Sequence, residues 1–218
     1  MKNIIITIWL LVSLSIAATA QTQTGNLFIG GNINWNNNEF EVNDVNNASA
    51  LGLRIDKQNT FNFQTTFGTF VKDNLVLGMF LNYENIDSES SNSAERSSLI
   101  NKTKAISVGP FVRKFFPLNE KFSFYTQGSV GYSRSSNRQT YESNNQGYNS
   151  HLKYNKFVAA LKPGLVYFAT NKFGVDLSVQ GLQYIVGKEK DTDQSFSRFD
   201  AGFNLPNLTI GLNLYLGR

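Results

Sequence analysis

Few side chains in this sequence could catalyse a reaction. His151 is the only histidine and stands in a stretch rich in serine and asparagine. A serine hydrolase needs such a base, oriented by a carboxylate and within hydrogen-bonding distance of a serine. A lipase-like site would require a serine on a neighbouring strand, so a solvated loop histidine is the favoured interpretation.

Metal and cofactor chemistry has equally weak support. The chain has no cysteine, which excludes disulfides and thiolate metal sites. Asp191 and Asp193 could touch a calcium ion, but the remaining ligands of an EF-hand are missing. Neither a P-loop nor a GxGxxG motif occurs. We therefore predict no enzyme, no catalytic residue, no metal and no cofactor.

Long alternating segments make up most of the chain. In Lys104–Arg134, two runs with period-two alternation flank Pro117–Glu120, a group of turn residues too short for anything but a hairpin. Each run is about a dozen residues long, roughly twice the usual strand of a globular sheet. This length suits a sheet whose apolar face meets lipid.

Eight such segments can be placed along the sequence. Six lie at Asn26–Asn36, Gln58–Phe70, Asn74–Asp87, Tyr154–Ala169, Lys172–Val186 and about Pro206–Gly217, and the hairpin supplies the other two. Tight turns at 71–74, 117–120 and 170–172 alternate with long polar connections at roughly 37–57, 88–101, 135–153 and 187–205. Short turns at one end and long loops at the other are typical of a transmembrane β-barrel.

We therefore predict an all-β fold, an eight-stranded antiparallel up-and-down transmembrane β-barrel with four long extracellular loops and three short periplasmic turns. Such a sheet must close, because each unpaired backbone group costs several kcal/mol in hydrocarbon. Eight strands enclose an interior that side chains can fill. Small residues alternate on the inner face with a few aromatics, which predicts a plugged lumen: Phe111, Tyr125, Phe168, Tyr184 and Tyr215.

Residues 1–20 resemble a cleavable secretory signal, which leaves 21–218 as the barrel domain. Lys2 supplies a positive start, Ile4–Ile16 an apolar core, and Ala18–Ala20 a small-residue cleavage site. The apolar core is shorter than the ~20 residues of a spanning helix. The mean hydropathy of −0.26 is compatible with a membrane barrel, in which only every second residue faces lipid. The formal charge of +4 is too weak an excess to indicate nucleic acid.

Four charged residues fall on the polar, inward face of their segments: Glu84, Arg113, Lys162 and Asp176. Arg113 lies about four residues above its tight turn and Asp176 about five above its own, so the two should sit at similar depth. Burying an unpaired charge is very costly, which predicts a lumen charge network that plugs the barrel. The alternative is a water-filled lumen in which these side chains are solvated.

Two further sets of side chains share the outward face. Basic residues at the loop ends of the strands could contact outer-leaflet phosphates or merely snorkel into water: Lys57, Lys102, Lys104, Arg134 and Lys153. Outward aromatics form two bands, as expected of girdles at both lipid interfaces. The loop-end band is Trp35, Phe61, Phe63, Tyr83, Tyr132 and Phe157, and the turn-end band is Phe122, Phe124, Tyr167 and Phe173.

With these features the chain resembles the small outer-membrane β-barrel proteins of Gram-negative bacteria, of the OmpA-barrel and OmpX type. The hairpin text SVGPFVRKFFPLNEKFSFYTQGSVGYS is similar to the central hairpin of that family. The resemblance implies an integral outer-membrane protein without a cofactor. Family members commonly end in a terminal aromatic read by the barrel-assembly machinery, whereas this chain ends Tyr215-Leu216-Gly217-Arg218.

The leading functional prediction is a structural or surface-interacting role, in which a plugged, monomeric barrel displays loops outside the cell. Its expected partners are outer-membrane lipid and lipopolysaccharide, with a protein or glycan bound by the loops and no nucleic acid. Two alternatives remain open. One is a narrow channel for small solutes. The other is a soluble periplasmic ligand-binding barrel of lipocalin type, which would turn its apolar face inward.

Overall fold

The computed structural model describes residues 21–43, 53–92, 97–143, 146–202 and 208–217. The predicted signal segment, 1–20, lies outside this part of the chain. Within it, no helix is long and apolar enough to cross a membrane. The strands are β1 (Leu27–Asn43), β2 (Leu53–Lys72), β3 (Leu75–Asn92), β4 (Ser97–Pro117), β5 (Phe122–Ser143), β6 (Gln146–Phe168), β7 (Phe173–Ser178), β8 (Gly181–Glu189), β9 (Ser195–Gly202) and β10 (Thr209–Leu216).

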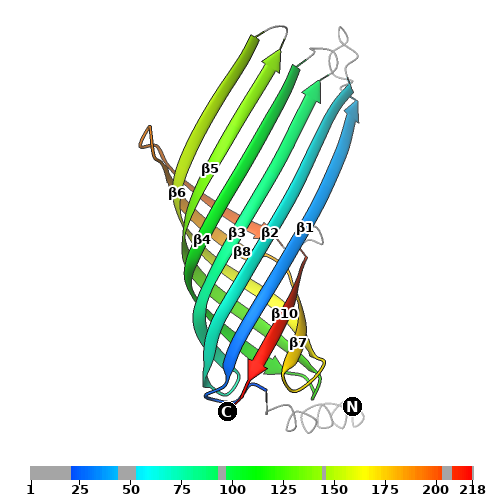
Figure 1. The fold of residues 1–218 in the computed structure, drawn as a ribbon, viewed down its shortest axis with the longest axis vertical. Coiled ribbons are helices and arrows are strands. Elements are labelled where there is room, and N and C mark those ends of the chain that lie inside the picture. Colours follow the sequence, from blue (N-terminus) through cyan, green and yellow to red (C-terminus); the bar gives the residue numbers. More distant parts are fainter. Residues whose placement is uncertain (1–20, 44–52, 93–96, 144–145, 203–207, 218) are drawn as a thin grey trace, which may run out of the picture.

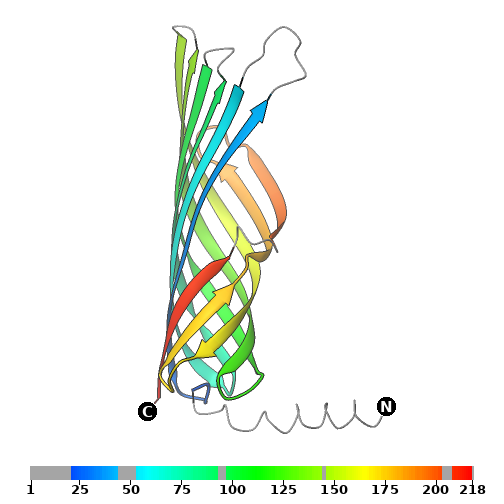
Figure 2. The same cartoon turned by 90° about the vertical axis from the view of Figure 1, so that its right-hand side faces the viewer.

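The strands form one antiparallel sheet that closes on itself. β1 to β6 pair in sequence order, and β6 then pairs with β7. β10 lies between β7 and β1 and pairs with both, so that the ring is complete at the turn end. Figures 1 and 2 show the strands tilted together around a common axis. The prediction of an all-β, antiparallel up-and-down barrel is confirmed.

The ten strands make eight passes. The predicted seventh segment is divided into β7 and β8, whereas the predicted eighth segment corresponds to β10 alone. β9 lies in the predicted connection 187–205, and together with β10 it makes the eighth pass. β7 and β8 run in the same direction and both pair with β6. β9 pairs with β8, whereas β10 pairs with β7. In the loop-end half, the other edge of β9 has no strand partner among the described residues.

The break between β7 and β8 is centred on Gly181. Its φ of +67° lies in the left-handed region that favours glycine, and a Cβ there would collide with the carbonyl oxygen of Leu161. The irregularity shifts the side-chain alternation by one residue, so that Ile185 is buried in the lumen while its neighbours face outward. Tyr184, which was expected inside, is 48% exposed. That expectation was wrong because strict alternation does not continue through the break.

The connections differ at the two ends of the barrel. The tight turns between β2 and β3, β4 and β5, and β6 and β7 lie where they were predicted. The prediction of four long loops was wrong for much of their length. The connections 37–57, 88–101 and 135–153 are largely strand, because β1 to β6 continue well past the outward apolar residues, and 187–205 contains the end of β8 and all of β9. A strand that extends out of the membrane needs no apolar face. Its sequence therefore loses the alternation of apolar and polar residues, although its backbone hydrogen bonds to the neighbouring strands continue. Figure 2 shows β1 to β6 rising past the shorter strands as a projecting sheet.

The two faces of the sheet have the polarity of a membrane barrel. Outward residues such as Leu77, Met79 and Leu81 are about half exposed, at 47%, 50% and 50%. Inward polar residues, including Asn32 and Thr66, are buried. A lipocalin-type barrel requires the opposite arrangement, with apolar residues inside and polar residues in water. An exposed apolar band of this extent suits a lipid environment instead.

The segment before β1 covers the turn end of the barrel. Thr22 is buried, and its hydroxyl hydrogen-bonds to Oδ1 of Asn74 at 2.5 Å. The carboxylate of Asp73 accepts hydrogen bonds from the backbone N–H and the hydroxyl of Thr24, both at 2.9 Å. These bonds lower the pKa of Asp73, because they stabilise the charged form of the carboxyl group. The segment just before β1 is thereby tied to the β2–β3 turn.

Candidate functional site

The turn-end half of the lumen is filled by a cluster of buried rings. Phe28 of β1 lies at its centre, in edge contact with Phe70 and Phe115 at 6.5 Å and 6.4 Å between ring centroids. Edge-to-face contacts at such separations are favourable arrangements of aromatic side chains. The cluster also includes Val76, Phe80, Phe111, Tyr125, Val166, Phe168 and Tyr215. A closely packed apolar layer therefore crosses the barrel at this level.

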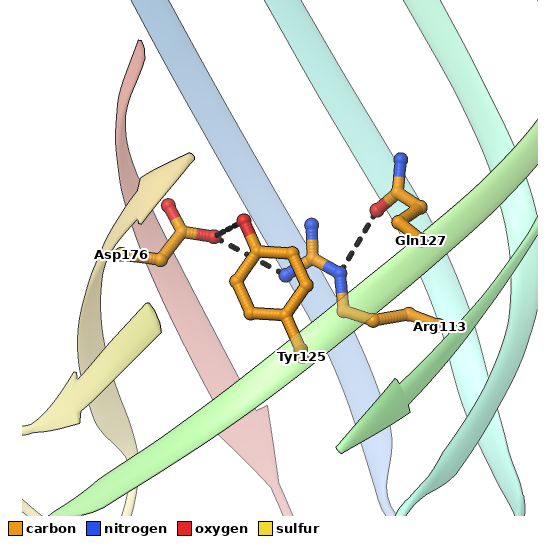
Figure 3. A network of polar contacts seen from close by, with 4 residues as sticks. All are labelled: Arg113, Tyr125, Gln127 and Asp176. Atoms are coloured by element: carbon orange, nitrogen blue, oxygen red, sulfur yellow. Dashed lines mark hydrogen bonds and ion pairs between the residues drawn. The ribbon is translucent and has the colours of Figure 1, made fainter. Parts of the chain in front are cut away.

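A buried network of charged and polar side chains lies against this cluster (Figure 3). Nη1 of Arg113 contacts Oδ2 of Asp176 at 3.3 Å, and both side chains are fully buried. Arg113 also donates from Nε to Oε1 of Gln127 at 2.8 Å, while the Tyr125 hydroxyl donates to Oδ2 of Asp176 at 2.9 Å. The guanidinium lies 4.8 Å from the ring centroid of Phe28 and 4.2 Å from that of Tyr125. Cation–π contacts of this kind stabilise a guanidinium group that has been removed from water.

The positions of the network follow from strand register. Arg113 on β4 is paired across the sheet with Gln127 on β5, which is in turn paired with Lys162 on β6. Asp176 approaches from β7 on the opposite wall, beside Gly211 of β10. A Cβ at Gly211 would overlap the Asp176 carboxylate, so the glycine leaves the space that the carboxylate occupies.

The four inward charges predicted from the sequence lie at two levels. Arg113 and Asp176 form the ion pair, and the charge of Lys162 lies close enough to interact with both. Glu84 lines the lumen nearer the loop end and does not join the pair. The sequence interpretation missed Gln127 and placed Tyr125 in the lumen only as a space-filling aromatic, not as a member of the charge network. Neutral side chains give no charge signal, although the parity of β5 placed both residues inward.

Three of the five predicted outward basic residues converge on one external groove. Lys104, Arg134 and Lys153 line it on β4, β5 and β6, together with Lys190 from the β8–β9 turn. The backbone N–H of Lys190 donates to the carbonyl oxygen of Lys153 at 2.8 Å, which holds the turn against the groove. Nε of Arg134 donates to the Tyr132 hydroxyl at 3.3 Å. We call these four basic residues the basic groove.

The other two predicted basic residues are placed differently. Nζ of Lys57 lies 2.9 Å from a carboxylate oxygen of Glu39, so an acidic residue already balances its charge. Lys102 is paired in the register with Asp87 of β3, which places a carboxylate on the same outer face. Neither residue lines the basic groove.

The predicted aromatic girdles lie on the outer surface. None of their ten side chains is buried, and Trp35 is the most exposed at 80%. Several form cross-strand contacts, such as Tyr132 with Phe157 at 5.5 Å and Phe122 with Tyr167 at 5.0 Å between ring centroids. Aromatic cross-strand pairs stabilise a sheet, and this position also suits lipid interfaces.

The candidate catalytic and metal residues form no complete site. Nε2 of His151 lies 2.7 Å from the hydroxyl of Ser136 on the neighbouring strand. No carboxylate of the described residues hydrogen-bonds to His151, so the base is not oriented as a triad requires. Asp193 pairs with Lys188 at 3.0 Å. The described ranges contain no group of three or more metal-ligating side chains.

Comparison with known proteins gives a family match over most of the chain. Residues 6–205 match the model of the outer membrane protein beta-barrel domain. No curated protein matches at a significant level. Neisserial surface protein A is similar at 13% identity and a TM-score of 0.45, over 87% of this chain and 98% of that one.

Two other solved structures are similar over comparable lengths. OprG from Pseudomonas aeruginosa is 11% identical with a TM-score of 0.45, covering 92% of this chain and all of that one. Ail, the attachment invasion locus protein of Yersinia pestis, is 15% identical with a TM-score of 0.38. The match covers 89% of this chain and 100% of that one.

Removing one partner of the buried ion pair should destabilise the barrel strongly. We expect Arg113→Met to lower the free energy of unfolding by about 3–5 kcal/mol, because the Asp176 carboxylate is left buried without its cation. The Arg113→Met, Asp176→Leu double variant should recover most of that loss. Urea unfolding of the protein folded in detergent micelles measures both effects.

Arg198→Met is the matched control for this measurement. Nε of Arg198 lies 2.8 Å from Oδ2 of Asp200, and the Arg198 side chain is largely exposed. Exposed ion pairs contribute only about 0–1 kcal/mol to stability. An Arg113 variant as stable as the Arg198 variant would contradict the structural role of the buried pair.

Proposed function

The chain belongs to the outer membrane protein beta-barrel domain family, and we propose that it acts there as a plugged scaffold for surface interaction. Its location is the outer membrane, with the apolar band in lipid. In the proposed orientation the tight turns face the periplasm and the projecting sheet faces the outside. The single observation that carries the proposal is the combination of a filled turn-end lumen with a sheet that extends far beyond the lipid band.

The filled lumen favours a scaffold over a channel. A channel for small solutes needs continuous water from one end to the other. The aromatic cluster and the fully buried side chains of Arg113 and Asp176 occupy the turn-end half of the interior. Packed interiors leave few voids larger than a water molecule. A solute path would therefore require these side chains to leave their positions.

Planar-bilayer recording tests whether the lumen is plugged. We expect the purified protein to produce no current above baseline, because the packed rings exclude a water-filled path. A general porin recorded in the same bilayer is the positive control. Steady single-channel steps from the protein would contradict the plugged scaffold and favour the narrow channel.

The projecting sheet supports the proposed role in surface interaction. Past Ile33, β1 pairs only with β2 in the described residues, and before Tyr154, β6 pairs only with β5. Sheet edges of this kind offer unpaired backbone groups to an added strand. Outward residues on this part of the sheet are mainly polar, as expected for contact with water and an extracellular partner.

Cysteine labelling tests the orientation, since the chain has no native cysteine. Tyr148 is 65% exposed near the tip of the projecting sheet, and Leu118 is 52% exposed in the β4–β5 turn. We expect Tyr148→Cys to react with a membrane-impermeant maleimide on intact cells. Leu118→Cys should react only after the cells are broken. The reverse result would place the projecting sheet in the periplasm and overturn the proposal.

The basic groove suits contact with phosphate groups of the outer leaflet. It lies at the loop end of the apolar band, with Tyr83 and Tyr132 among its lining residues. Arg and Lys are the side chains that recognise phosphate, and each basic residue near an anionic membrane surface contributes about 1 kcal/mol. We therefore assign lipopolysaccharide phosphates as the lipid partner of this groove.

Thermal unfolding in vesicles tests the lipid contact. The Tm of the protein should be higher with bisphosphorylated lipid A than with phosphatidylcholine alone, and Lys104→Gln, Arg134→Gln, Lys153→Gln together should abolish the difference. The matched control replaces the same number of turn-end lysines with Gln: Lys72, Lys121 and Lys172. If both triple variants respond to lipid A alike, the groove has no specific role and the basic side chains merely snorkel.

A further inference from the structure

The loop-end half of the lumen contains a polar cavity of about 430 Å³. Its deepest lining residues include Gln64 and Gln127, which are 8% and 2% exposed. Gln58 and Arg198, near the loop end, are exposed. The cavity is therefore a cup, closed below by the Arg113 network and the aromatic cluster and open toward the loop end. Its volume lies within the range of about 300–1,000 Å³ typical of small-molecule sites.

The cup is lined mainly by uncharged polar side chains. Carboxamides dominate, among them Asn34, Gln58, Asn62, Gln64, Asn82 and Gln183. A carboxamide both donates and accepts hydrogen bonds, which suits a ligand that carries many hydroxyl groups. Oδ1 of Asn82 is buried and has no hydrogen-bond partner among the described residues. The wall therefore retains unused hydrogen-bonding capacity.

Lys162 gives the floor of the cup a net positive charge. Lys162 lines the cup, whereas Arg113 and Asp176 form an ion pair with each other behind this lining. None of the described residues accepts a hydrogen bond from Nζ of Lys162 or forms an ion pair with it. Lys162 is only partly buried and lines the cup, so a ligand in the cup can reach its ammonium group, and an anionic group would supply the missing partner.

The upper wall also favours anions. Lys156 and Arg198 line it, and Glu84 is the one acidic residue among the described residues that line the cup. Arg198 is partly balanced by Asp200. The positive excess therefore extends from the upper wall to the floor, in a confined space where like charges raise the local concentration of counter-ions.

We infer that the cup binds a small hydroxylated anion, a sugar phosphate or a sugar acid. The anionic group contacts Lys162 at the floor, and the hydroxyl groups hydrogen-bond to the carboxamides of the wall. The inference goes beyond the proposed surface function, because the site lies on the inner face of the barrel and closes before the aromatic cluster.

Isothermal titration calorimetry on the folded protein in detergent micelles tests the inference. The probes are glucose 6-phosphate, glucuronate, glucose and inorganic phosphate. We expect saturable binding of at least one of the two sugar anions, with weaker binding of glucose and of inorganic phosphate. Lys162→Met should weaken the sugar anion by about tenfold to a hundredfold, the effect of removing one charge-assisted hydrogen bond.

Lys121→Met is the matched control, because Lys121 is exposed in the β4–β5 turn and lines neither the cup nor the basic groove. It should bind the sugar anion as the unaltered protein does. Asn62→Ala, which removes one wall carboxamide, provides a second measurement if Lys162→Met does not fold, and it should also weaken binding. Fold is checked by heat-modifiable gel mobility.

Several results would overturn the inference. Absence of saturable heat with either sugar anion would mean that the cup holds only water. Inorganic phosphate binding as tightly as glucose 6-phosphate would remove the role of the carboxamide wall. Unchanged affinity in Lys162→Met, or in Asn62→Ala where that variant is used, would place binding elsewhere. None of these results bears on the scaffold proposal, which depends on the turn-end plug and the projecting sheet.

Discussion

Closure of the backbone ladder in lipid is the constraint on which the rest of this structure depends. Hydrocarbon cannot hydrogen-bond to an exposed N–H or C=O group, so every strand inside it needs two neighbours. β10 meets that need by pairing with β1 on one side and β7 on the other. Once the ring is closed, every inward side chain must fit a narrow interior. Large inward residues are then forced into contact even when they are distant in sequence.

The inward residues sort along the barrel axis, and this sorting divides the lumen into layers. Phenylalanine and tyrosine dominate the turn end, whereas carboxamides and serine dominate the loop end. Arg113 lies at the boundary, with its guanidinium over the rings of Phe28 and Tyr125 and its hydrogen bonds directed to Gln127 and Asp176. A guanidinium suits that boundary, because its faces stack on aromatics while its edge donates hydrogen bonds. The plug and the polar cup thus share one dividing layer.

Much of this arrangement could be predicted from sequence, because strand parity and distance from a tight turn are local properties. They placed Arg113 and Asp176 on the inner face at a similar depth. The same rule failed for Tyr184, since the left-handed backbone at Gly181 shifts the alternation. It also failed for the long connections, where strands that are polar on both faces carry no alternation. Lys57 has the predicted orientation. Its ion pair with Glu39 could not be predicted, because it depends on the register between β1 and β2 and not on the alternation within one strand.

Parity also separates the two positively charged regions of the barrel. On β6, Lys153 lines the external groove, whereas Lys156 and Lys162 line the lumen. Asp176 forms an ion pair with Arg113, whereas Lys162 is partly buried and presents its charge to the polar cavity. A purely structural plug has no need of that charge, and the inferred anion site in the cup above the plug gives it a role.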